Sequence, residues 1–510
     1  MKQYYLGIEF GSTRVKAVLI DGEHRIVKSG DYTWKSSLEN GVWTYHMEDV
    51  QTGLRTAIRN LGELPGAVSA MGISGMMHGY LAFDKDWNLL APFHTWQNTM
   101  TGEAAEQLTA EFGFNIPQRW SIAHLYQAIL NGEAHVKNIA HITTLAGYVH
   151  YLLTGENVLG VGEASGMFPI DSEALDYDAA MLEKFDALIA KYGFAWTARS
   201  VLPKVLTAGQ AAGALTQAGS TFLDGLLSAG IPFCPPEGDA GTGMTATNAV
   251  APRTGNVSAG TSIFAMVVLE KPLSKVYQEI DMVTTPSGKP VAMVHCNNCT
   301  NDMNAWVSLL GETAKLFGAE VSTGELFTKL YQKSLEGDAD CSGVLTYNYM
   351  AGEGITHLDE GRPMVVRKPE SSFTLANFLR SQLYATMSTL KLGMDILAEE
   401  HVAIDSLTGH GGLFKTPVVG QKYMAAACRA PVTCMESAGE GGPYGMALLA
   451  SYLVQKQDGQ TLEQYLETEI FADVKRTTLA PDPEDEAGFD RYLSWYRSAL
   501  AAENAAVKAF

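Results

Sequence analysis

The chain has 510 residues, which is too long for one hydrophobic core and predicts two domains of about 250 residues each. Hydrophobic residues make up 46% and charged residues 18%, as in ordinary globular enzymes. The formal net charge of −20 argues against nucleic acid or an anionic membrane surface as the main partner.

The first thirty residues predict three short strands. Residues 4–10 and 15–20 are rich in apolar and β-branched side chains, and 26–29 is a third run. The connections are too short for a crossover helix, so we expect these strands to be antiparallel neighbours.

A second segment repeats this pattern at about half the chain length. IEFGSTRVKAVLID at 8–21 and VSAGTSIFAMVVLE at 257–270 both place a glycine and two hydroxyl residues between apolar strands. Gly11 and Gly260 lie 249 positions apart. The repeat indicates two domains of one plan, each with a phosphate-sized turn facing a shared cleft. The alternative is that glycine followed by Ser or Thr is simply good hairpin chemistry.

We expect the domains to be 1–250 and 251–510, with the boundary near Ala251-Pro252-Arg253. Helical periodicity follows at 103–112, 144–154, 373–401 and 443–456. The acidic run PDPEDE at 481–486 is interpreted as a short solvated turn.

Targeting and redox signals are weak. The N-terminal residues MKQYYLGIEF lack the apolar core of a signal peptide, and no run approaches the length of a membrane helix. Six cysteines form no disulfide framework, so a cytoplasmic location is expected. Cys296 and Cys299 form a CxxC without the second ligand pair that a structural zinc site requires.

Familiar nucleotide-binding motifs are absent from the sequence. It contains no GxxxxGK[ST] and no GxGxxG between a strand and a helix. Any bound phosphate must therefore be held by the twin turns, with Arg14 and Lys16 as nearby cations. Glu9, just before the first turn, could reach Mg²⁺, and Asp239 in PPEGDAGTGM is a candidate base. The alternative for Asp239 is an ordinary turn aspartate.

Several motifs in order resemble the FGGY carbohydrate kinases over nearly the whole chain. GIEFGSTRVKAVLID resembles the first phosphate motif of that family, with Glu9 in place of the usual Asp, and NVSAGTS at 256–262 resembles the second. EGDAGTG resembles the segment that carries the catalytic base. GHGGLFKTPVVGQKYMAAACRAPV at 409–432 resembles the adenosine motif, with the purine expected on the helix that follows, and GEGGPYGMALLA at 439–450 resembles the closing motif.

Two further motifs concern the sugar. ISGMMHGYLAFD at 73–84 resembles the sugar-contacting stretch of xylulokinases, with Met77-His78 as the contacting pair and Met76 in place of a commoner glutamine. Trp96-Gln97-Asn98 resembles a Trp-x-Asp motif, with Asn98 in place of the Asp. Glu163 replaces the Asp of an Asp-Ala-Ser-Gly motif, and we interpret that motif as mainly architectural.

The resemblance implies an α/β, two-domain actin-like or Hsp70-like ATPase fold with ribonuclease H-like domains, and nucleotide and sugar in the interdomain cleft. It implies ATP and Mg²⁺ as cofactors and a ketopentose of the D-xylulose or L-ribulose type as acceptor. It also allows a homodimer, since many relatives are dimers. The alternatives are another sugar or polyol, such as L-xylulose, a hexulose or a glycerol-like acceptor, and a chaperone-like ATPase on the same fold.

The implied roles can be assigned residue by residue. Asp239 is the base, Glu9 the metal ligand, and Met77, His78, Trp96 and Asn98 join Asp239 in binding sugar. The residues implied to bind ATP and its phosphates are Gly11, Ser12, Thr13, Arg14, Lys16, Gly260, Thr261, Ser262, Gly411 and Gly412.

Overall fold

The structure is a computed structural model that describes residues 2–435 and 441–509. The chain forms two compact units that are not continuous in sequence. Unit 1 contains Met1–Pro252, Val268–Val291 and Ser437–Val474, and unit 2 contains Arg253–Val267, Ala292–Glu436 and Lys475–Phe510. The expected second domain, 251–510, is therefore not one compact unit, because two of its segments belong to unit 1.

The elements of unit 1 are β1 (Tyr4–Phe10), β2 (Arg14–Asp21), β3 (Ile26–Thr33), β4 (Ser37–Glu39), β5 (Val42–Thr44), α1 (Met47–Asn60), β6 (Val68–Gly75), β7 (Leu81–Phe83), α2 (Gly102–Phe112), α3 (Ser121–Leu130), β8 (His141–Thr143), α4 (Leu145–Thr154), β9 (Val158–Gly160), α5 (Val161–Ala164), β10 (Ile170–Asp171), β11 (Asp176–Tyr177), α6 (Ala179–Ile189), α7 (Ala198–Val201), β12 (Lys204–Leu206), α8 (Gln217–Phe222), β13 (Glu237–Gly238), α9 (Asp239–Ala246), β16 (Ile280–Thr284), α14 (Gly441–Gln455) and α15 (Leu462–Tyr465).

The elements that lie wholly or mostly in unit 2 are β14 (Thr254–Ala259), β15 (Ile263–Val268), β17 (Pro290–Cys296), α10 (Asn301–Leu316), α11 (Thr323–Ser334), β18 (Val344–Tyr347), β19 (Met364–Arg367), α12 (Leu375–Glu399), β20 (Ser406–Gly411), α13 (Val419–Cys428), β21 (Val432–Met435), β22 (Arg476–Leu479) and α16 (Pro483–Ala509).

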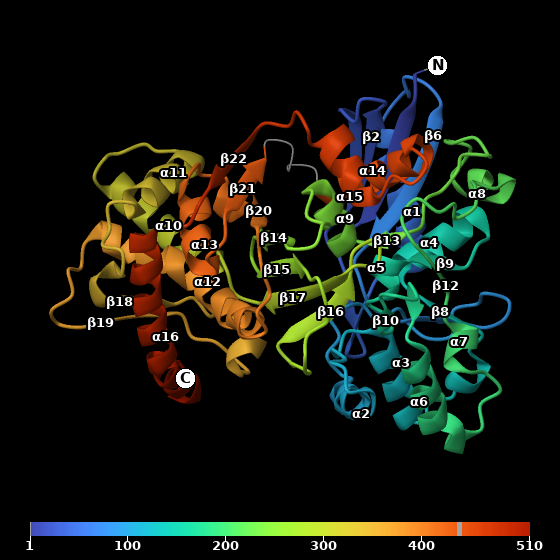
Figure 1. The fold of residues 1–510 in the computed structure, drawn as a ribbon, viewed down its shortest axis with the longest axis horizontal. Coiled ribbons are helices and arrows are strands. Elements are labelled where there is room, and N and C mark those ends of the chain that lie inside the picture. The colour runs from blue at the N-terminus through green and yellow to red at the C-terminus, as the bar shows by residue number, and fades with distance from the viewer. Residues whose placement is uncertain (1, 436–440, 510) are drawn as a thin grey trace. The chain divides into compact units, whose positions relative to one another are not determined.

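The main sheet of unit 1 has the strand order β13-β6-β1-β2-β3 (Figure 1). β1 pairs antiparallel with β2, and β2 pairs antiparallel with β3, which confirms the three predicted strands and their antiparallel pairing. β6 and β13 extend the sheet in parallel on the other side of β1. Glu9 lies near the end of β1, and Asp239 directly follows β13. Both residues therefore lie at strand ends of the same sheet.

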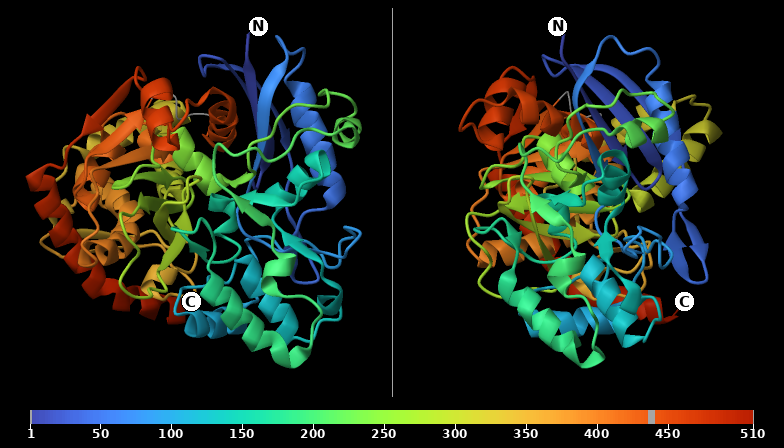
Figure 2. Two further views of the ribbon diagram at one scale, coloured as in Figure 1. Left: turned by 45° about the vertical axis from the view of Figure 1, so that its right-hand side comes forward. Right: turned by 90° about the vertical axis from the view of Figure 1, so that its right-hand side faces the viewer.

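Helices cover both faces of this sheet (Figures 1 and 2). Because side chains alternate along a strand, Leu6 and Ile8 enter the core that contains Val50 and Leu54 of α1, while Gly7 faces α14. A Cβ at Gly7 would lie 2.1 Å from the Pro443 oxygen of α14. Glycine at this position allows the helix backbone to rest directly on the strand, which explains why α14 belongs to unit 1.

The sheet of unit 2 repeats the plan of the first. β14 pairs antiparallel with β15 and parallel with β20, as β1 does with β2 and β6. β21 follows β20 in parallel, and β22 pairs antiparallel with β21. The two glycine turns thus occupy equivalent positions in the two units, in agreement with the internal repeat.

The predicted helices are confirmed as α2, α4, α12 and α14, with ends within two residues of those expected. The interpretation of PDPEDE as a solvated turn is wrong, because Pro483 begins α16 and Asp485 is buried. Arg380 and Lys422 place their side-chain nitrogens 2.5 and 2.7 Å from its carboxylate oxygens. These two cations lie far from Asp485 in the sequence and offset the cost of burying its charge, so local sequence does not predict the burial.

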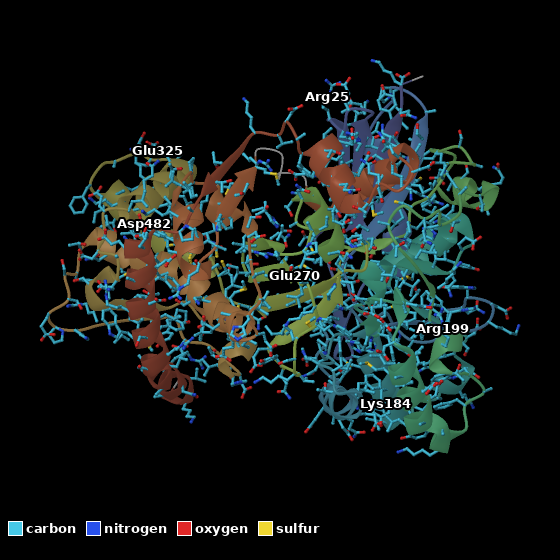
Figure 3. All side chains as sticks on the ribbon, viewed as in Figure 1. Arg25, Lys184, Arg199, Glu270, Glu325 and Asp482 are labelled. Atoms are coloured by element: carbon cyan, nitrogen blue, oxygen red, sulfur yellow. The ribbon has the colours of Figure 1, made fainter. Side chains whose placement is uncertain are left out.

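Within the described residues, no helix is both long and apolar enough to cross a membrane. Charged side chains are spread over both units (Figure 3). Arg25 and Arg199, labelled there, lie 2.9 and 3.1 Å from the carboxylates of Asp21 and Asp176. These exposed arginines are therefore engaged by local carboxylates.

Candidate active site

Asp239 is the first residue of α9 and follows β13 directly. Its Oδ1 accepts hydrogen bonds from the amides of Met77, at 3.1 Å, and Ala240, at 3.0 Å. The residue is exposed, yet protein crowded around the carboxyl group raises its pKa by desolvation, against the lowering effect of these amides. The chain therefore presents an oriented carboxyl group to solvent.

Glu9 lies near the end of β1 on the face that α14 covers. Its Oε2 is buried without a hydrogen-bond partner in the described part of the chain. Burial raises the pKa of Glu9 to about 8, assisted by the charge of Asp239 and opposed by Lys16. A Cβ at Gly442 would lie 1.5 Å from Oε2, so only glycine fits beside this carboxylate.

Two further buried carboxyl groups adjoin Asp239, and neither was predicted to be part of the site. Glu237 is 1% exposed and accepts hydrogen bonds from the amides of Glu163, at 2.9 Å, and Gly162, at 3.4 Å. Glu163 is fully buried, and a Cβ at Gly238 would lie 2.4 Å from its Oε2. Burial raises the pKa of Glu237 to about 8 and that of Glu163 well above its usual value. Four acidic residues, counting Glu9, thus gather around α9.

The sugar motif around Met77 and His78 packs directly against this group. Both residues are nearly buried, and His78 adopts a positive φ of 71°, an uncommon conformation for a side chain of this size. The His78 Nδ1 lies 3.1 Å from the Gly166 carbonyl oxygen, so Nδ1 carries the proton. Its ring stacks on Trp120 with centroids 6.2 Å apart. Such strain is typical of functional positions.

Trp96 and Asn98 occupy different environments. Trp96 is 39% exposed, whereas Asn98 is 2% exposed. The Asn98 amide nitrogen donates to the carbonyl oxygens of Trp43 and Thr95, and its oxygen accepts from the Trp43 amide at 2.8 Å. Asn98 therefore fastens β5 to the segment that carries Trp96, and both of its amide protons are engaged within the protein.

The first glycine turn connects β1 and β2. Ser12, Thr13 and Arg14 are exposed, and Arg14 lies 3.4 Å from Asp31. Lys16 is the cross-strand partner of Glu9, which places its charge near that carboxylate. The predicted phosphate residues of unit 1 and the predicted metal ligand therefore meet at one end of the sheet.

The predicted nucleotide residues of unit 2 also lie together. β14 ends at Ala259, just before the second glycine turn, and Ala259 is the register partner of Gly411 on β20. Gly411 has a φ of 98°, and a Cβ there would lie 2.4 Å from the Ala259 carbonyl oxygen. Gly260 and the Gly411-Gly412 turn are thus adjacent, as a shared role in nucleotide binding requires.

The segment with the CxxC supports the second turn from behind. Cys296 and Cys299 are buried free thiols, and the Glu353 carboxylate accepts hydrogen bonds from the amides of Asn297, at 2.9 Å, and Asn298, at 3.3 Å. Thr300 stands at the N-cap position of α10, but its hydroxyl makes no capping hydrogen bond and donates instead to the Gly260 oxygen at 2.6 Å. Among the described residues, no three His, Cys, Asp or Glu side chains could hold a metal ion together.

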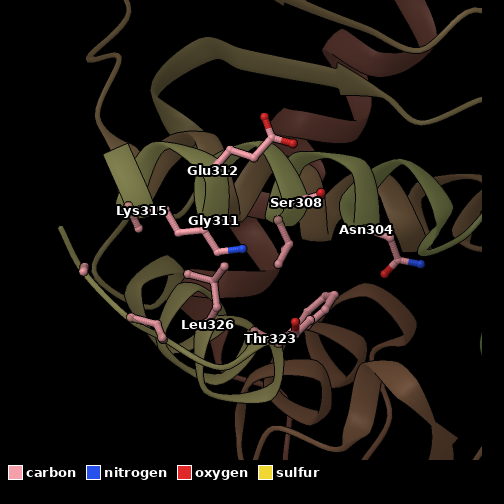
Figure 4. Close-up of a pocket in the computed structure, with 12 residues that line it drawn as sticks. Asn304, Ser308, Gly311, Glu312, Lys315, Thr323 and Leu326 are labelled. Atoms are coloured by element: carbon pink, nitrogen blue, oxygen red, sulfur yellow. The ribbon is translucent and has the colours of Figure 1, made fainter. Parts of the chain in front are cut away.

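Unit 2 contains a pocket of about 360 Å³ between α10 and α11 (Figure 4). Its walls combine apolar groups such as Val307, Leu326 and Phe327 with the polar groups of Asn304 and Ser308. The Lys315 side chain extends along α10 toward Ser308. This size and mixture are typical of small-molecule sites. The helix that follows Gly411-Gly412, α13, contributes no residue to its walls.

The two α/β units share one topology, and in each a glycine turn joins the first two antiparallel strands. This arrangement defines the actin-like ATPase fold. The chain belongs to the FGGY family of carbohydrate kinases: the family model of the N-terminal domain matches residues 4–245 and that of the C-terminal domain matches residues 255–454. The expected fold class and family are therefore confirmed.

Known carbohydrate kinases are similar to this chain, some over nearly its full length and others over part of it. A xylulose kinase of Haemophilus influenzae is 22% identical over 96% of this chain and 99% of its own. A glycerol kinase of Thermococcus gammatolerans is 26% identical, but the match covers 36% of this chain and 41% of that kinase. The crystal structure of a gluconate kinase from Lactobacillus acidophilus has a TM-score of 0.80 at 17% identity, covering 99% of each chain. The structure of a Brucella ovis xylulose kinase has a TM-score of 0.79 at 20% identity, covering 98% of this chain and 99% of that one.

Proposed function

We propose that this chain transfers the γ-phosphoryl group of MgATP to a hydroxyl of a ketopentose of the D-xylulose or L-ribulose type. The observation that carries this proposal is Asp239, an exposed carboxyl group that is oriented by the Met77 amide and lies close enough to Glu9 to raise its pKa. The family of carbohydrate kinases supplies the reaction class.

Asp239 acts as the proton acceptor for the sugar hydroxyl. Two amides hold its Oδ1 in place, so the carboxyl group keeps a fixed orientation and its other oxygen can accept the proton. The raised pKa increases its basicity, which favours proton transfer as the new O–P bond forms. Met77 and the strained His78 then fix the acceptor sugar beside it.

Glu9 is suited to hold Mg²⁺, because a buried carboxylate oxygen without a partner is the kind of ligand that hard cations prefer. Because no three His, Cys, Asp or Glu side chains of the described residues could hold a metal ion together, phosphate oxygens and water would complete the shell of the ion. Bound Mg²⁺ would neutralise charge on the transferring phosphoryl group. Lys16 and the exposed Ser12, Thr13 and Arg14 contribute donors to the same phosphates.

The pocket between α10 and α11 is suited to the nucleoside end of ATP. Thr300, which bonds to the Gly260 turn, immediately precedes α10, and Ser308 lies eight residues farther along. At 1.5 Å per residue this separates the turn from the pocket by about 12 Å. An extended triphosphate and ribose can span that distance. The nucleotide would then contact α10 and α11 in addition to the Gly411-Gly412 turn.

The sugar itself is inferred from several relatives that are xylulose kinases, one of them similar over almost its whole length. A polyol is the second candidate, favoured by the glycerol kinases among the relatives. Asn98, whose amide protons are engaged within the protein, and Met76 depart from the usual family pattern in the predicted sugar motifs, so the assay includes acceptors other than D-xylulose and L-ribulose.

The experiment is a coupled assay of ADP release with MgATP and a panel of D-xylulose, L-ribulose, L-xylulose, a hexulose, glycerol and gluconate. We expect one ketopentose to stimulate turnover strongly, and Asp239→Asn to lower that rate by about 100-fold or more. Asp458→Asn, an exposed aspartate of unit 1, serves as the matched control and should leave the rate unchanged.

Retention of more than about a tenth of the rate in Asp239→Asn would contradict the assignment of the base. If the rate of ATP turnover does not depend on any acceptor or on either substitution, the chain is a chaperone-like ATPase and not a sugar kinase. If glycerol alone stimulates ADP release strongly, the acceptor is a polyol and not a ketopentose.

A further inference from the structure

All three carbonyl groups of the first glycine turn accept hydrogen bonds from two aromatic residues. The Trp34 indole Nε1 donates to the Gly11 oxygen at 2.7 Å, and the Trp34 amide donates to the Thr13 oxygen at 3.1 Å. The Tyr45 hydroxyl donates to the Ser12 oxygen at 2.7 Å. Both side chains are nearly buried, and their rings lie 4.3 Å apart.

These bonds determine where the amides of the turn point. A trans peptide is planar, with its C=O and the following N–H directed to opposite sides. Holding the Gly11 and Ser12 carbonyls on the aromatic side therefore directs the amides of Ser12 and Thr13 to the other side. Neither amide has an acceptor within the described ranges, and both residues are exposed. Adjacent open amides of this kind form an anion-binding concavity.

The second glycine turn shows the same arrangement with unrelated residues. The Cys299 amide donates to the Thr261 oxygen at 3.0 Å, and the Thr300 amide donates to the Gly260 oxygen at 3.1 Å. The carbonyls of this turn are thus also engaged from behind. The two units thus hold the carbonyls of their glycine turns with different donors, the Trp34 and Tyr45 side chains with the Trp34 amide in unit 1 and the Cys299 and Thr300 amides in unit 2.

We propose that Trp34 and Tyr45 are positioning residues for ATP: they hold the carbonyls of Gly11, Ser12 and Thr13 away from the nucleotide so that the turn amides face its phosphates. Neither residue touches the substrate in this role. The inference rests on the proposed function, since it assumes that the turn receives the phosphates of a nucleotide.

Tyr45→Phe is the sharpest test, because it removes one hydroxyl and keeps the ring. We expect the Kd of MgATP, measured by calorimetry without sugar, to rise about tenfold while the Kd of adenosine changes less than twofold. In the coupled assay, kcat/KM for MgATP should fall by a similar factor and KM for the sugar should not change. Trp34→Phe should shift the same quantities in the same direction.

Tyr80→Phe is the matched control. Tyr80 is 1% exposed in the same unit, and its hydroxyl bonds to His135 Nε2 at 2.9 Å, so the variant also loses one buried hydroxyl contact. We expect it to lower the melting temperature as Tyr45→Phe does and to leave MgATP binding unchanged. Equal effects of the two variants on MgATP binding would overturn the proposal, as would a Tyr45→Phe protein with wild-type affinity.

The binding experiment separates this inference from the kinase assignment. A wild-type protein that binds MgATP but phosphorylates no acceptor would contradict the proposed function, while the two tyrosine variants would still decide the role of Tyr45. A wild-type protein that binds no nucleotide would overturn both.

Discussion

Glu9 carries one methylene more than the aspartate that is usual at its position in the family, and Gly442 lies where this longer side chain ends. The missing Cβ of Gly442 provides the space that Oε2 occupies, since a methyl group would overlap it at 1.5 Å. The two residues are 433 positions apart in sequence yet form one steric unit in unit 1. We infer that their identities are coupled.

Gly442→Ala should therefore displace Glu9 and lower kcat/KM by about tenfold or more, because a misplaced metal ligand weakens transition-state stabilisation. Combining it with Glu9→Asp should recover part of this loss, since the shorter side chain avoids the methyl group. A double-mutant cycle on kcat/KM measures the coupling.

Gly243→Ala provides the comparison for this cycle, because a Cβ at Gly243 meets nothing within 4 Å. We expect near-wild-type kinetics for it. Additive losses in Gly442→Ala and Glu9→Asp would show that the methyl group acts on something other than Glu9.

At the level of single residues, the sequence predicted those that sit in recognisable motifs. Asp239 and Met77 were chosen from separate motifs, and the structure joins them by a hydrogen bond. The sequence does not predict Glu163 as a neighbour of Asp239, because its proximity depends on α5 packing beside β13. The sequence EGDAG has a second acidic residue two positions before the base, and this spacing could have indicated Glu237 as part of the site.

At the level of elements, periodicity and turn chemistry predict the strands and the long helices. They do not predict the pocket between α10 and α11. It is formed where the exposed face of α10 approaches the start of α11, and neither helix has a motif that marks it. The sequence predicts the purine on α13, and the pocket adds a second candidate position for the nucleoside. Local pattern predicts an element, whereas a cavity depends on how two elements pack.

Filling this pocket tests its proposed role. A Cβ at Gly311 would lie 3.0 Å from Leu326 Cδ2 across the pocket, so Gly311→Leu should fill much of the space between the helices. We expect the KM for MgATP to rise about tenfold or more and the KM for the sugar to stay constant, as measured by the coupled assay.

Gly324→Leu is the control for that substitution. Gly324 lies in α11, meets nothing within 4 Å and does not line the pocket, so its variant should retain wild-type kinetics. An unchanged KM for MgATP in Gly311→Leu would place the nucleoside elsewhere in unit 2.

For the whole molecule, the buried acids predict a stability that falls as the pH rises. Glu9 and Glu237 each have a pKa of about 8 when folded against 4.5 as the ordinary value. Their neutral forms favour the fold, so the stabilisation is complete below pH 4.5 and is lost as the pH rises through 8. The melting temperature of the ligand-free protein should decrease by about 3 °C or more between pH 6 and 9.

Glu237→Gln isolates one contribution to this decrease. The amide stays neutral at every pH, so the variant should show a shallower decline of melting temperature than the wild type across the same interval. Parallel curves would mean that other groups cause the pH dependence.

The position of α14 has a consequence for how the protein is made. The strand that this helix covers is synthesised first, at residues 4–10, but its partner does not leave the ribosome until residues 441–455 have been translated. Until then one face of β1, with the gap above Gly7, has no cover. The nascent chain must therefore keep its earliest sheet from aggregating through most of translation, and a chain that stops before α14 would release unit 1 with that face still bare.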